Sequence, residues 1–571
     1  VNIHRAPMCG RNFEYMGEDP YLTSRTAVGY INGLQANGVM AVIKHFTANF
    51  QEYDRNYISS DIDERTLNEI YFPAFKAAVQ EAKVGSVMSS YNLLNGTWTT
   101  HHPWLLRTVL RDQWGFDGIL MSDWGSTHYC LPAAQGGLDL EMAGGEKMNP
   151  DSLRYFINRG DLDMNVIDEK VQHILQTMIK FGFMDNEQLD SSIPEDNPAS
   201  VKTALDVARE GMVLLKNEEN LLPLKADKIK KVAVVGQNAL RYLTGGGSGR
   251  VTPIHYVSFY EGIKAVGAQK GVEVKYIDEY DHLDDDVYVA SGSDEHGFNG
   301  EYFNNTDLSG APIATKVDAN INFNFQNGTG VEGIGTSNYS VRWTAELRPM
   351  EDGEYVFHLG GDDGFRLYID DKKVIDDWNP GQERYKTYEM RLSAGKTYAV
   401  KIEYYQGTGA AIIDFYWTKV GADDYFQASL NDVDVVIACF GHDSGSEAEG
   451  GDRTFALPSK QKELITKVIS KTTTPIVGVV TAGGNVEMQS WIRHLDGLLW
   501  AWYPGQEGGT ALGEILFGDI NPSGKLPVTF EKRWADNPTY NSYYDSDNDK
   551  HVEFTEGIFM GYRGYDKSGK T

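Results

Sequence analysis

The sequence predicts a multidomain α/β protein that carries a separate all-β domain. Over the first ~180 residues, short apolar strands alternate with helical stretches, which is typical of parallel βαβ units. From about residue 297 to 420, Tyr, Phe, Asp, Gly and Asn alternate with a period of two, which is typical of a β-sandwich. The length of 571 residues fits about four domains at ~150 residues each.

The first region, residues 1–184, is predicted to be part of a (β/α) barrel of the TIM type. Its strands end in polar residues, and a barrel of this kind gathers such residues at one face. A complete barrel has eight strands, so we expect the N-terminal ones to be missing. The five predicted strands are Asn2–Arg5, Val39–Ile43, Ser86–Ser90, Gly118–Met121 and Gly137–Leu140, with helical stretches such as Glu64–Glu81 between them.

An α/β sandwich domain is predicted to follow a polar linker at residues 185–205. Its two parts, 206–292 and 421–531, contain continuous apolar strands and flank an inserted β-sandwich at 293–420. In the insertion, Asp362 and Asp363 fit a polar turn better than a calcium or sugar site. Residues 532–571 are predicted to be a C-terminal extension.

Charge and composition exclude several classes of partner. With 52 basic and 81 acidic residues, the net charge is −29, which argues against nucleic acid or an anionic membrane surface. No apolar run reaches the ~18 residues of a transmembrane helix. Cys9, Cys130 and Cys439 are scattered and predict neither a disulfide framework nor a metal site.

Asp123 is the first candidate for chemistry. It follows an apolar strand and lies between Ser122 and Trp124. A carboxylate at a barrel mouth beside an indole fits a nucleophile in a sugar pocket, because the indole face can stack on sugar C–H groups. The alternative is an aspartate that caps the next helix.

A second candidate is the pair Lys44 and His45 at a strand end, with Arg55 on the same loop and Arg11 in the first loop. Such cations can bind hydroxyl groups and keep nearby carboxylates ionised, although structural ion pairing would give the same pattern. A metal site formed by His45, His101 and His102 is disfavoured, because the last two are adjacent.

Two glycine-containing loops complete the candidates. The acidic segment Asp443–Arg453 follows a parallel strand, where open α/β sheets place ligand contacts, and could supply a general acid; the alternative is a solvated loop. The run Thr244–Gly249 lacks the spacing of a phosphate-binding loop, so a tight loop is predicted there rather than nucleotide binding.

Taken in order, these motifs resemble glycoside hydrolase family 3. The inserted segment resembles the protective-antigen-type β-sandwich module found within some β-glucosidases of that family, and the C-terminal end resembles the entry to a fibronectin-type-III-like domain. The matching motifs are Gly10–Glu14, Glu18–Pro20, Lys44–Phe46, Arg55, Ser89–Asn92, Ser122–Trp124, Leu214–Asn217, Glu449–Arg453, Tyr503–Gly509 and Asn521–Pro527.

The resemblance implies an exo-acting, retaining hydrolase of β-linked sugars. Asp123 is then the nucleophile and Glu449 the acid/base, with Glu447 as the alternative acid/base. The substrate is expected to be a small β-glucoside or short oligosaccharide, with no metal or organic cofactor. The residues that match positions binding the sugar or orienting the nucleophile are Arg11, Lys44, His45, Arg55, Tyr91 and Trp124.

This mechanism makes two demands on the carboxyl groups. Asp123 must be ionised, and Glu449 must be protonated near neutral pH, for which we expect a raised pKa in a drier acidic loop. In the family's N-acetylglucosaminidases, which use a short His–Asp pair as acid/base, a Gly-His-Gly run follows Lys-His-Phe. Here Lys44–Phe46 continues as Thr47-Ala48-Asn49, so that branch is disfavoured.

Two other functions stay open at this point. A β-xylosidase of the same family would share all these motifs, and a non-catalytic protein could bind carbohydrate through the inserted sandwich. Family members are often secreted or periplasmic, so a periplasmic or extracellular location is one option, and the sequence leaves the compartment open. Assembly as a homo-oligomer is left open.

Overall fold

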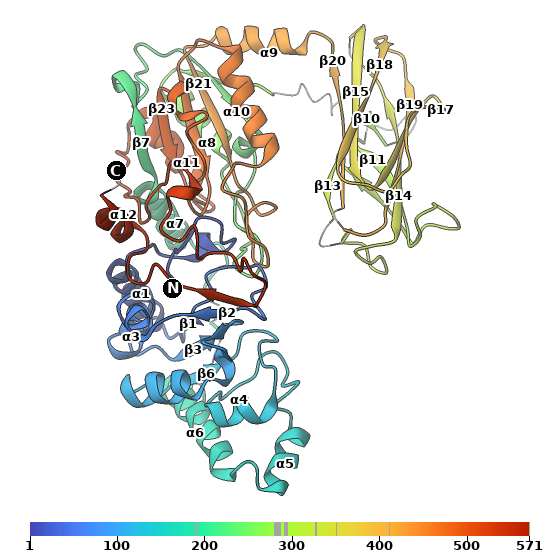
Figure 1. The fold of residues 1–571 in the computed structure, drawn as a ribbon. Coiled ribbons are helices and arrows are strands. Elements are labelled where there is room, and N and C mark those ends of the chain that lie inside the picture. Colours follow the sequence, from blue (N-terminus) through green and yellow to red (C-terminus); the bar gives the residue numbers. More distant parts are fainter. Residues whose placement is uncertain are drawn as a thin grey trace. The chain divides into compact units, whose positions relative to one another are not determined.

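The computed structural model describes residues 1–569 except 188, 191, 279–286, 290–294, 326–327, 350 and 410. Contacts divide the chain into two compact units, drawn in Figure 1. The second unit interrupts the first along the sequence. The first unit contains Val1–Lys275, Asp434–Ser470 and Pro475–Thr571, and the second contains Tyr276–Val433 and Lys471–Thr474.

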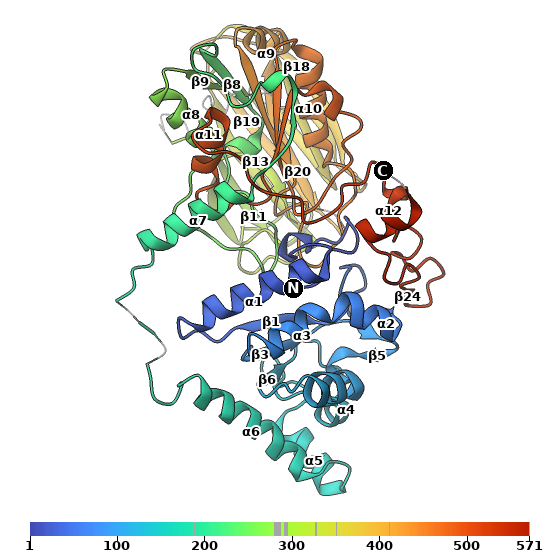
Figure 2. The same cartoon turned by 90° about the vertical axis from the view of Figure 1, so that its left-hand side faces the viewer.

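The N-terminal part of the first unit is built on a parallel sheet in the order β1-β3-β6. One further parallel bridge joins Met121 to Leu140. Helices α1 and α3 lie against this sheet (Figure 2) and share its apolar core. The strands are β1 (Val42–Phe46), β3 (Ser86–Ser89) and β6 (Ile119–Met121).

Local signals set the ends of the helices around this sheet. Asp19 caps α1 by accepting from the Leu22 N–H, and Pro20 occupies the first turn. The helical elements are α1 (Pro20–Gln35), α2 (Glu64–Thr66), η2 (Leu67–Tyr71), α3 (Pro73–Gln80), η4 (Trp104–Gln113), α4 (Cys130–Gly136), α5 (Pro150–Arg159) and α6 (Met164–Lys180), with the short turns η1 (Asn12–Glu14) and η3 (Thr99–His101).

Two of the predicted strands differ from the structure. Asn2–Arg5 is not a strand, because the Asn2 side-chain amide, in place of a backbone ladder, accepts from the His45 N–H (2.8 Å) and donates to the His45 carbonyl (3.1 Å). The strand predicted at Val39–Ile43 lies three residues later, so Lys44 and His45 belong to β1 rather than following it.

The C-terminal segment, predicted as an extension, returns to the N-terminal region. Strand β24 (His551–Glu553) pairs in parallel with β2 (Ser59–Asp61), and in Figure 1 the dark red strand lies beside β2. The buried Arg5 binds Glu556 at 2.7 Å. The same small sheet contains β4 (Leu93–Leu94) and β5 (Thr97–Trp98), and η9 (Trp534–Asp536) and α12 (Tyr562–Ser568) complete the segment.

The rest of the first unit is a six-stranded sheet in the order β7-β23-β22-β21-β8-β9. Strand β7 is antiparallel to β23, whereas β8, β21, β22 and β23 pair in parallel. Every residue of β21 is buried, which explains its unbroken apolar run. The strands are β7 (Val213–Asn217), β8 (Lys231–Val235), β9 (Glu273–Tyr276), β21 (Val435–Gly441), β22 (Ile476–Thr481) and β23 (Gly497–Trp500).

Part of the predicted linker 185–205 is helical. Asn197 accepts from the Ala199 N–H, and with Pro198 in the first turn it starts α7, so only the residues before it can serve as a connection. The remaining helices are α7 (Pro198–Gly211), α8 (Phe259–Gln269), α10 (Ser459–Lys471) and α11 (Gly508–Phe517), with the turns η5 (Glu218–Asn220), η6 (Gln237–Ala239) and η8 (Ile492–His494).

The second unit consists of two antiparallel sheets around one aromatic-rich core. Asp363 ties two loops together by accepting from the Gly381 and Gly407 N–H groups at 2.9 and 2.7 Å, which gives this aspartate a structural role. One sheet has the order β12-β11-β14-β19-β16-β17 with β10 on β14, and the other has the order β13-β20-β15-β18.

The described elements of this unit are strands followed by one helix. They are β10 (Val287–Tyr288), β11 (Phe298–Phe303), β12 (Ala314–Asp318), β13 (Ile321–Asn324), β14 (Tyr339–Leu347), β15 (Gly353–Asp362), β16 (Gly364–Ile369), β17 (Lys372–Asp377), β18 (Arg384–Leu392), β19 (Tyr398–Gln406), β20 (Ile412–Lys419) and α9 (Ala422–Asn431). Among the described residues of the whole chain, no helix has the length and apolar character needed to span a bilayer.

Candidate active site

Asp123 lies two residues after β6 and is only 6% exposed. Its Oδ1 accepts from the Trp124 N–H at 2.7 Å, whereas its Oδ2 has no hydrogen-bond partner and lies 3.3 Å from His45 Nε2. Burial raises the pKa of Asp123. The Trp124 N–H, the charges of Lys44 and Arg11, and the Tyr91 hydroxyl act in the opposite direction and lower this pKa. The side chain thus presents one unengaged carboxylate oxygen beside several groups that favour its charged form.

The strand ends next to Asp123 supply the groups that surround it. Burial, and then the cations Arg11 and Lys44, hold the pKa of His45 well below its usual value, so this imidazole is neutral near pH 7. Tyr91 follows β3, and the Arg55 guanidinium lies 4.1 Å from the centre of its ring. Trp124 is 54% exposed, so its indole is open to a ligand.

Glu449 lies in the loop after β21 and is held at both oxygens. Its Oε1 accepts from Arg11 Nη1 (3.1 Å) and Arg55 Nη1 (3.0 Å), and its Oε2 accepts from the Ser248 N–H (2.8 Å). Burial raises the pKa of Glu449, but the Ser248 hydrogen bonds and the two arginines outweigh it and lower that pKa to about 2.

The glycine-rich run predicted as a tight loop forms the support of Glu449. The Gly246 carbonyl accepts from the Glu449 N–H at 3.2 Å, and Gly246 bridges to Ala448. Gly247 has φ +88°, and a Cβ there would meet Glu449 Cβ at 2.3 Å. Only glycine allows this approach.

Arg11 and Arg55 are each anchored by a second carboxylate. Arg11 is fully buried and binds both oxygens of Glu14 at 2.8 Å, and Arg55 Nη1 binds Glu52 Oε2 at 2.6 Å. These arginines therefore stay in place whether or not Glu449 accepts from them.

Asp123 and Glu449 share the same neighbours. The charge of Arg11 acts on both carboxylates, and the phenol of Tyr91 is influenced by both as well. The structure thus brings Arg11, Lys44, His45, Arg55 and Tyr91 together with the two predicted catalytic residues.

Glu447, the alternative acid/base, is a structural residue. Its side chain is 0% exposed and accepts from Arg453 Nε (2.7 Å), the Gly483 N–H (2.7 Å) and the Tyr503 hydroxyl (2.6 Å). A carboxylate with every side engaged has no room for a substrate oxygen.

The expectation of a raised pKa for the acid is wrong in this structure. The loop of Glu449 carries acidic residues in sequence, but the groups that contact its carboxylate are two arginines and an N–H. Burial acts more strongly on Asp123, so the pKa order of the two groups is the reverse of the expected one.

Sequence reasoning missed the residues that support Glu449. Glu52 accepts from the Gly450 N–H at 2.8 Å, and its own N–H donates to Asp452 at 2.8 Å, joining the two loops. The spacing of Glu52 three residues before Arg55 is a signal that could have pointed to this pair. Ser248 also supports Glu449, in part through its backbone N–H, a contact that no side-chain pattern predicts.

The histidines considered for a metal do not form a ligand group. Among the described residues, the carboxylates of Asp545, Asp547 and Asp549 are the group with ligand atoms within 4.8 Å of one another, and no His belongs to it. His101 Nε2 instead accepts from the His128 N–H at 3.3 Å.

Comparison with known proteins places this site in a family. The glycosyl hydrolase family 3 N-terminal domain matches residues 1–177, and the family's C-terminal domain matches residues 212–562. A β-glucosidase of Rhizobium radiobacter is 36% identical, with 99% of this chain and 71% of that protein covered. β-Glucosidase B of Emericella nidulans is 33% identical, with 100% and 71% covered.

Solved structures agree with these relatives. A Kluyveromyces marxianus β-glucosidase in complex with glucose matches with a TM-score of 0.78 at 27% identity, covering 100% of this chain and 72% of that one. DesR, a β-glucosidase from Streptomyces venezuelae in complex with D-glucose, matches with a TM-score of 0.71 at 28% identity, covering 100% and 70%. The chain belongs to glycosyl hydrolase family 3.

Proposed function

We propose that this chain is a retaining β-glucosidase that removes terminal β-D-glucosyl residues from small glucosides and short oligosaccharides. The observation that carries the proposal is the meeting of Asp123 and Glu449, from loops of two different sheets, around Arg11 and Tyr91. Relatives that cover the whole chain are named β-glucosidases. Retaining glycosidases need two carboxyl groups ~5–5.5 Å apart across the anomeric carbon.

Asp123 is the nucleophile in this mechanism. Its unpartnered Oδ2 forms a bond to the anomeric carbon as the bond to the leaving oxygen breaks, which gives a covalent glycosyl-enzyme. Arg11 and Lys44 favour the ionised form that attacks, and the neutral His45 offers no competing positive charge at Oδ2.

Glu449 is the acid/base. In the second step its carboxylate, which the low pKa keeps ionised in the free site, takes a proton from the water that attacks the anomeric carbon. In the first step it must give a proton to the leaving oxygen. We infer that bound substrate separates Glu449 from Arg11 and Arg55, which Glu14 and Glu52 hold in place.

Other residues of the site bind the sugar. Lys44 and Arg55 offer donors for hydroxyl groups, Tyr91 and His45 orient Asp123, and the exposed Trp124 forms a wall on which the sugar ring stacks.

The finer fold assignment belongs to the same proposal. Strands β1, β3 and β6 and the segment at Leu140 are consecutive strands of a TIM-type (β/α) barrel, whose active face carries Lys44, Tyr91 and Asp123. The six-stranded sheet is the α/β sandwich domain, and the two sheets of the second unit form the protective-antigen-type module.

The test compares Asp123→Ala with Asp117→Asn, an exposed aspartate whose side chain is 70% accessible. With 4-nitrophenyl β-glucoside, Asp123→Ala should lose turnover by at least about 10⁴-fold, whereas Asp117→Asn should keep it. Full activity of Asp123→Ala contradicts the nucleophile assignment. Preference of the wild type for 4-nitrophenyl β-xyloside favours a β-xylosidase, and no turnover of either favours a non-catalytic carbohydrate-binding protein.

A further inference from the structure

A second pocket lies in the first unit, beside the loop that supports Glu449. It has a volume of about 860 Å³ and is lined by residues of the segment from Leu240 to Lys264 together with Ser444. Neither Asp123 nor Glu449 lines it. Its volume falls within the ~300–1,000 Å³ typical of ligand sites.

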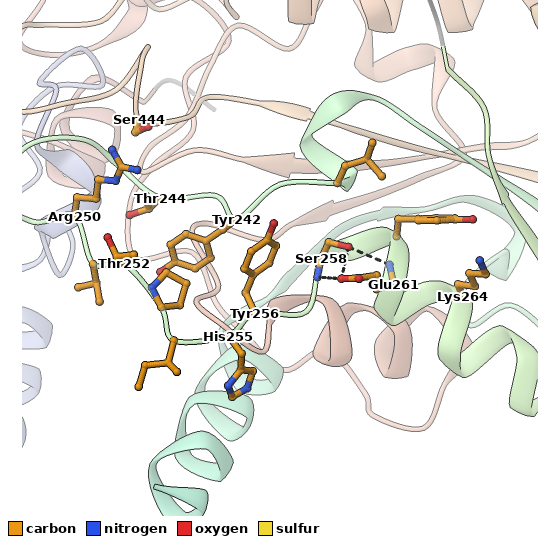
Figure 3. Close-up of a pocket in the computed structure, with 15 residues that line it drawn as sticks. Tyr242, Thr244, Arg250, Thr252, His255, Tyr256, Ser258, Glu261, Lys264 and Ser444 are labelled. Atoms are coloured by element: carbon orange, nitrogen blue, oxygen red, sulfur yellow. Dashed lines mark hydrogen bonds between the residues drawn. The ribbon is translucent and has the colours of Figure 1, made fainter. Parts of the chain in front are cut away.

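Aromatic rings form the middle of this pocket (Figure 3). The ring centroids of Tyr242 and Tyr256 are 5.7 Å apart and their planes are inclined at 50°. Tyr256 is 43% exposed, so one face of the pair remains open. Two inclined rings of this kind can pack against the apolar C–H faces of successive sugar units.

Polar side chains lie at one end of the same pocket. Arg250, Thr244, Thr252 and Ser444 gather there in Figure 3. Within the described part of the chain, the side chains of Arg250, Thr252 and Ser444 make no hydrogen bond or ion pair. Two hydroxyls and a guanidinium beside aromatic rings suit a ligand rich in hydroxyl groups.

The opposite end carries charges that are already engaged. Glu261 Oε2 accepts from the Ser258 N–H and hydroxyl at 3.0 and 2.8 Å, and Lys264 Nζ lies 5.2 Å from the Tyr260 ring. The Glu261 carboxylate is therefore already engaged within the protein, which leaves the hydroxyl and guanidinium groups at the other end as hydrogen-bond donors for a ligand.

The pocket wall is continuous with the support of the acid/base. Thr244 and Arg250 flank the glycine run, and the Arg250 N–H donates to the Gly247 carbonyl at 3.1 Å, closing the turn whose Ser248 N–H binds Glu449. Ser444 lies on the same loop as Glu449. The wall therefore adjoins the turn that holds the proposed acid/base, Glu449.

From these observations we propose that this pocket is a second carbohydrate-binding site, separate from the catalytic one, for a short neutral gluco-oligosaccharide. The rings of Tyr242 and Tyr256 stack on the sugar, and Arg250, Thr252 and Ser444 bind its hydroxyl groups. The choice of a glucose-based ligand rests on the proposed β-glucosidase function.

The experiment blocks the catalytic site and then measures binding. The full chain is reacted with 2,4-dinitrophenyl 2-deoxy-2-fluoro-β-glucoside, the label is counted by intact mass, and cellotriose is titrated by calorimetry. The labelled wild type should bind cellotriose saturably, and the double variant Tyr242→Ala/Tyr256→Ala should bind about tenfold more weakly or worse.

Two further variants guard against misfolding and nonspecific loss. Arg250→Gln changes an exposed side chain and should weaken binding severalfold. Tyr30→Ala, which replaces a 68% exposed tyrosine outside the pocket, should bind as the wild type does. The proposal is overturned if the labelled wild type shows no saturable binding. It is also overturned if the double variant and Arg250→Gln both bind cellotriose as tightly as the wild type does. Failure of the label to attach contradicts the β-glucosidase mechanism alone, and the titration is then read from the variants against unlabelled wild type.

Discussion

Glu447 and Glu449 are separated by one residue, yet their replacement by alanine should have opposite consequences. Glu447 is 0% exposed and accepts from Arg453, Gly483 and Tyr503. Glu447→Ala leaves the Arg453 guanidinium, 1% exposed, without its carboxylate. Breaking a buried ion pair in this way costs about 3–5 kcal/mol of folding free energy.

Glu449→Ala should be far less damaging to the fold. Its side chain is 14% exposed, and the two arginines that it contacts keep Glu14 and Glu52 as partners. No buried cation is left alone, so a cost of about 1–2 kcal/mol is expected. Loss of a general acid should instead slow cellobiose hydrolysis by about 10²–10⁴-fold.

Urea unfolding followed by tryptophan fluorescence measures the first effect, and kinetics with two substrates measure the second. Glu449→Ala should retain much of its rate of glycosyl-enzyme formation with 2,4-dinitrophenyl β-glucoside, whose leaving group needs no proton, and azide should speed its overall turnover. Glu447→Ala should lower the unfolding midpoint more than Glu449→Ala and show no azide rescue. The reasoning is refuted if Glu447→Ala is the variant that azide rescues, or if Glu449→Ala is the less stable of the two.

Three further predictions concern single residues of the site. The pKa of Glu449 is lowered from 4.5 to about 2, so the unfolded chain binds the extra proton between these pH values. This contribution to stability is present above pH 4.5 and lost toward pH 2. In Glu449→Gln, the free energy of unfolding from urea titrations should therefore fall by about 1–2 kcal/mol less over this pH range than in the wild type, after discounting for solvent screening. Tyr91→Phe removes a group that lowers the pKa of Asp123, so the acid limb of kcat/KM for 2,4-dinitrophenyl β-glucoside should move to higher pH. Trp124→Ala should raise KM about tenfold with little change in kcat, as measured by initial rates.

Each of these has a result that would contradict it. Equal acid sensitivity of Glu449→Gln and wild type means that Glu449 is not held as a carboxylate. An unmoved acid limb in Tyr91→Phe means that the phenol does not act on Asp123. A fall in kcat alone for Trp124→Ala means that the indole does not bind the ground-state sugar.

Strand and helix alternation could be predicted from local patterns, but side-chain pairing could not. The buried strand β21 was evident as a continuous apolar run. Asn2–Arg5 has the same alternation as a strand, and only the Asn2 amide bonded to the His45 backbone reveals otherwise. The return of β24 to β2 joins residues nearly 500 positions apart, which no local signal encodes.

The candidate site was predictable in membership but not in electrostatics. Motif resemblance selected Asp123, Glu449 and the cations around them, and the structure brings these residues together. The low pKa of Glu449 depends on Arg11, Arg55 and a backbone N–H from a glycine-rich loop. These groups are distant from Glu449 in sequence. The acidic composition of its own loop therefore led to the wrong prediction, a raised pKa for Glu449.

The most direct test of the account is to identify the carboxylate that becomes glycosylated. The protein is incubated with 2,4-dinitrophenyl 2-deoxy-2-fluoro-β-glucoside, digested with pepsin and analysed by tandem mass spectrometry. The account predicts one label per chain, on the peptide containing Ser122-Asp123-Trp124 and attached to Asp123. A label on any other carboxylate, or stoichiometric turnover without a trapped intermediate, would contradict it.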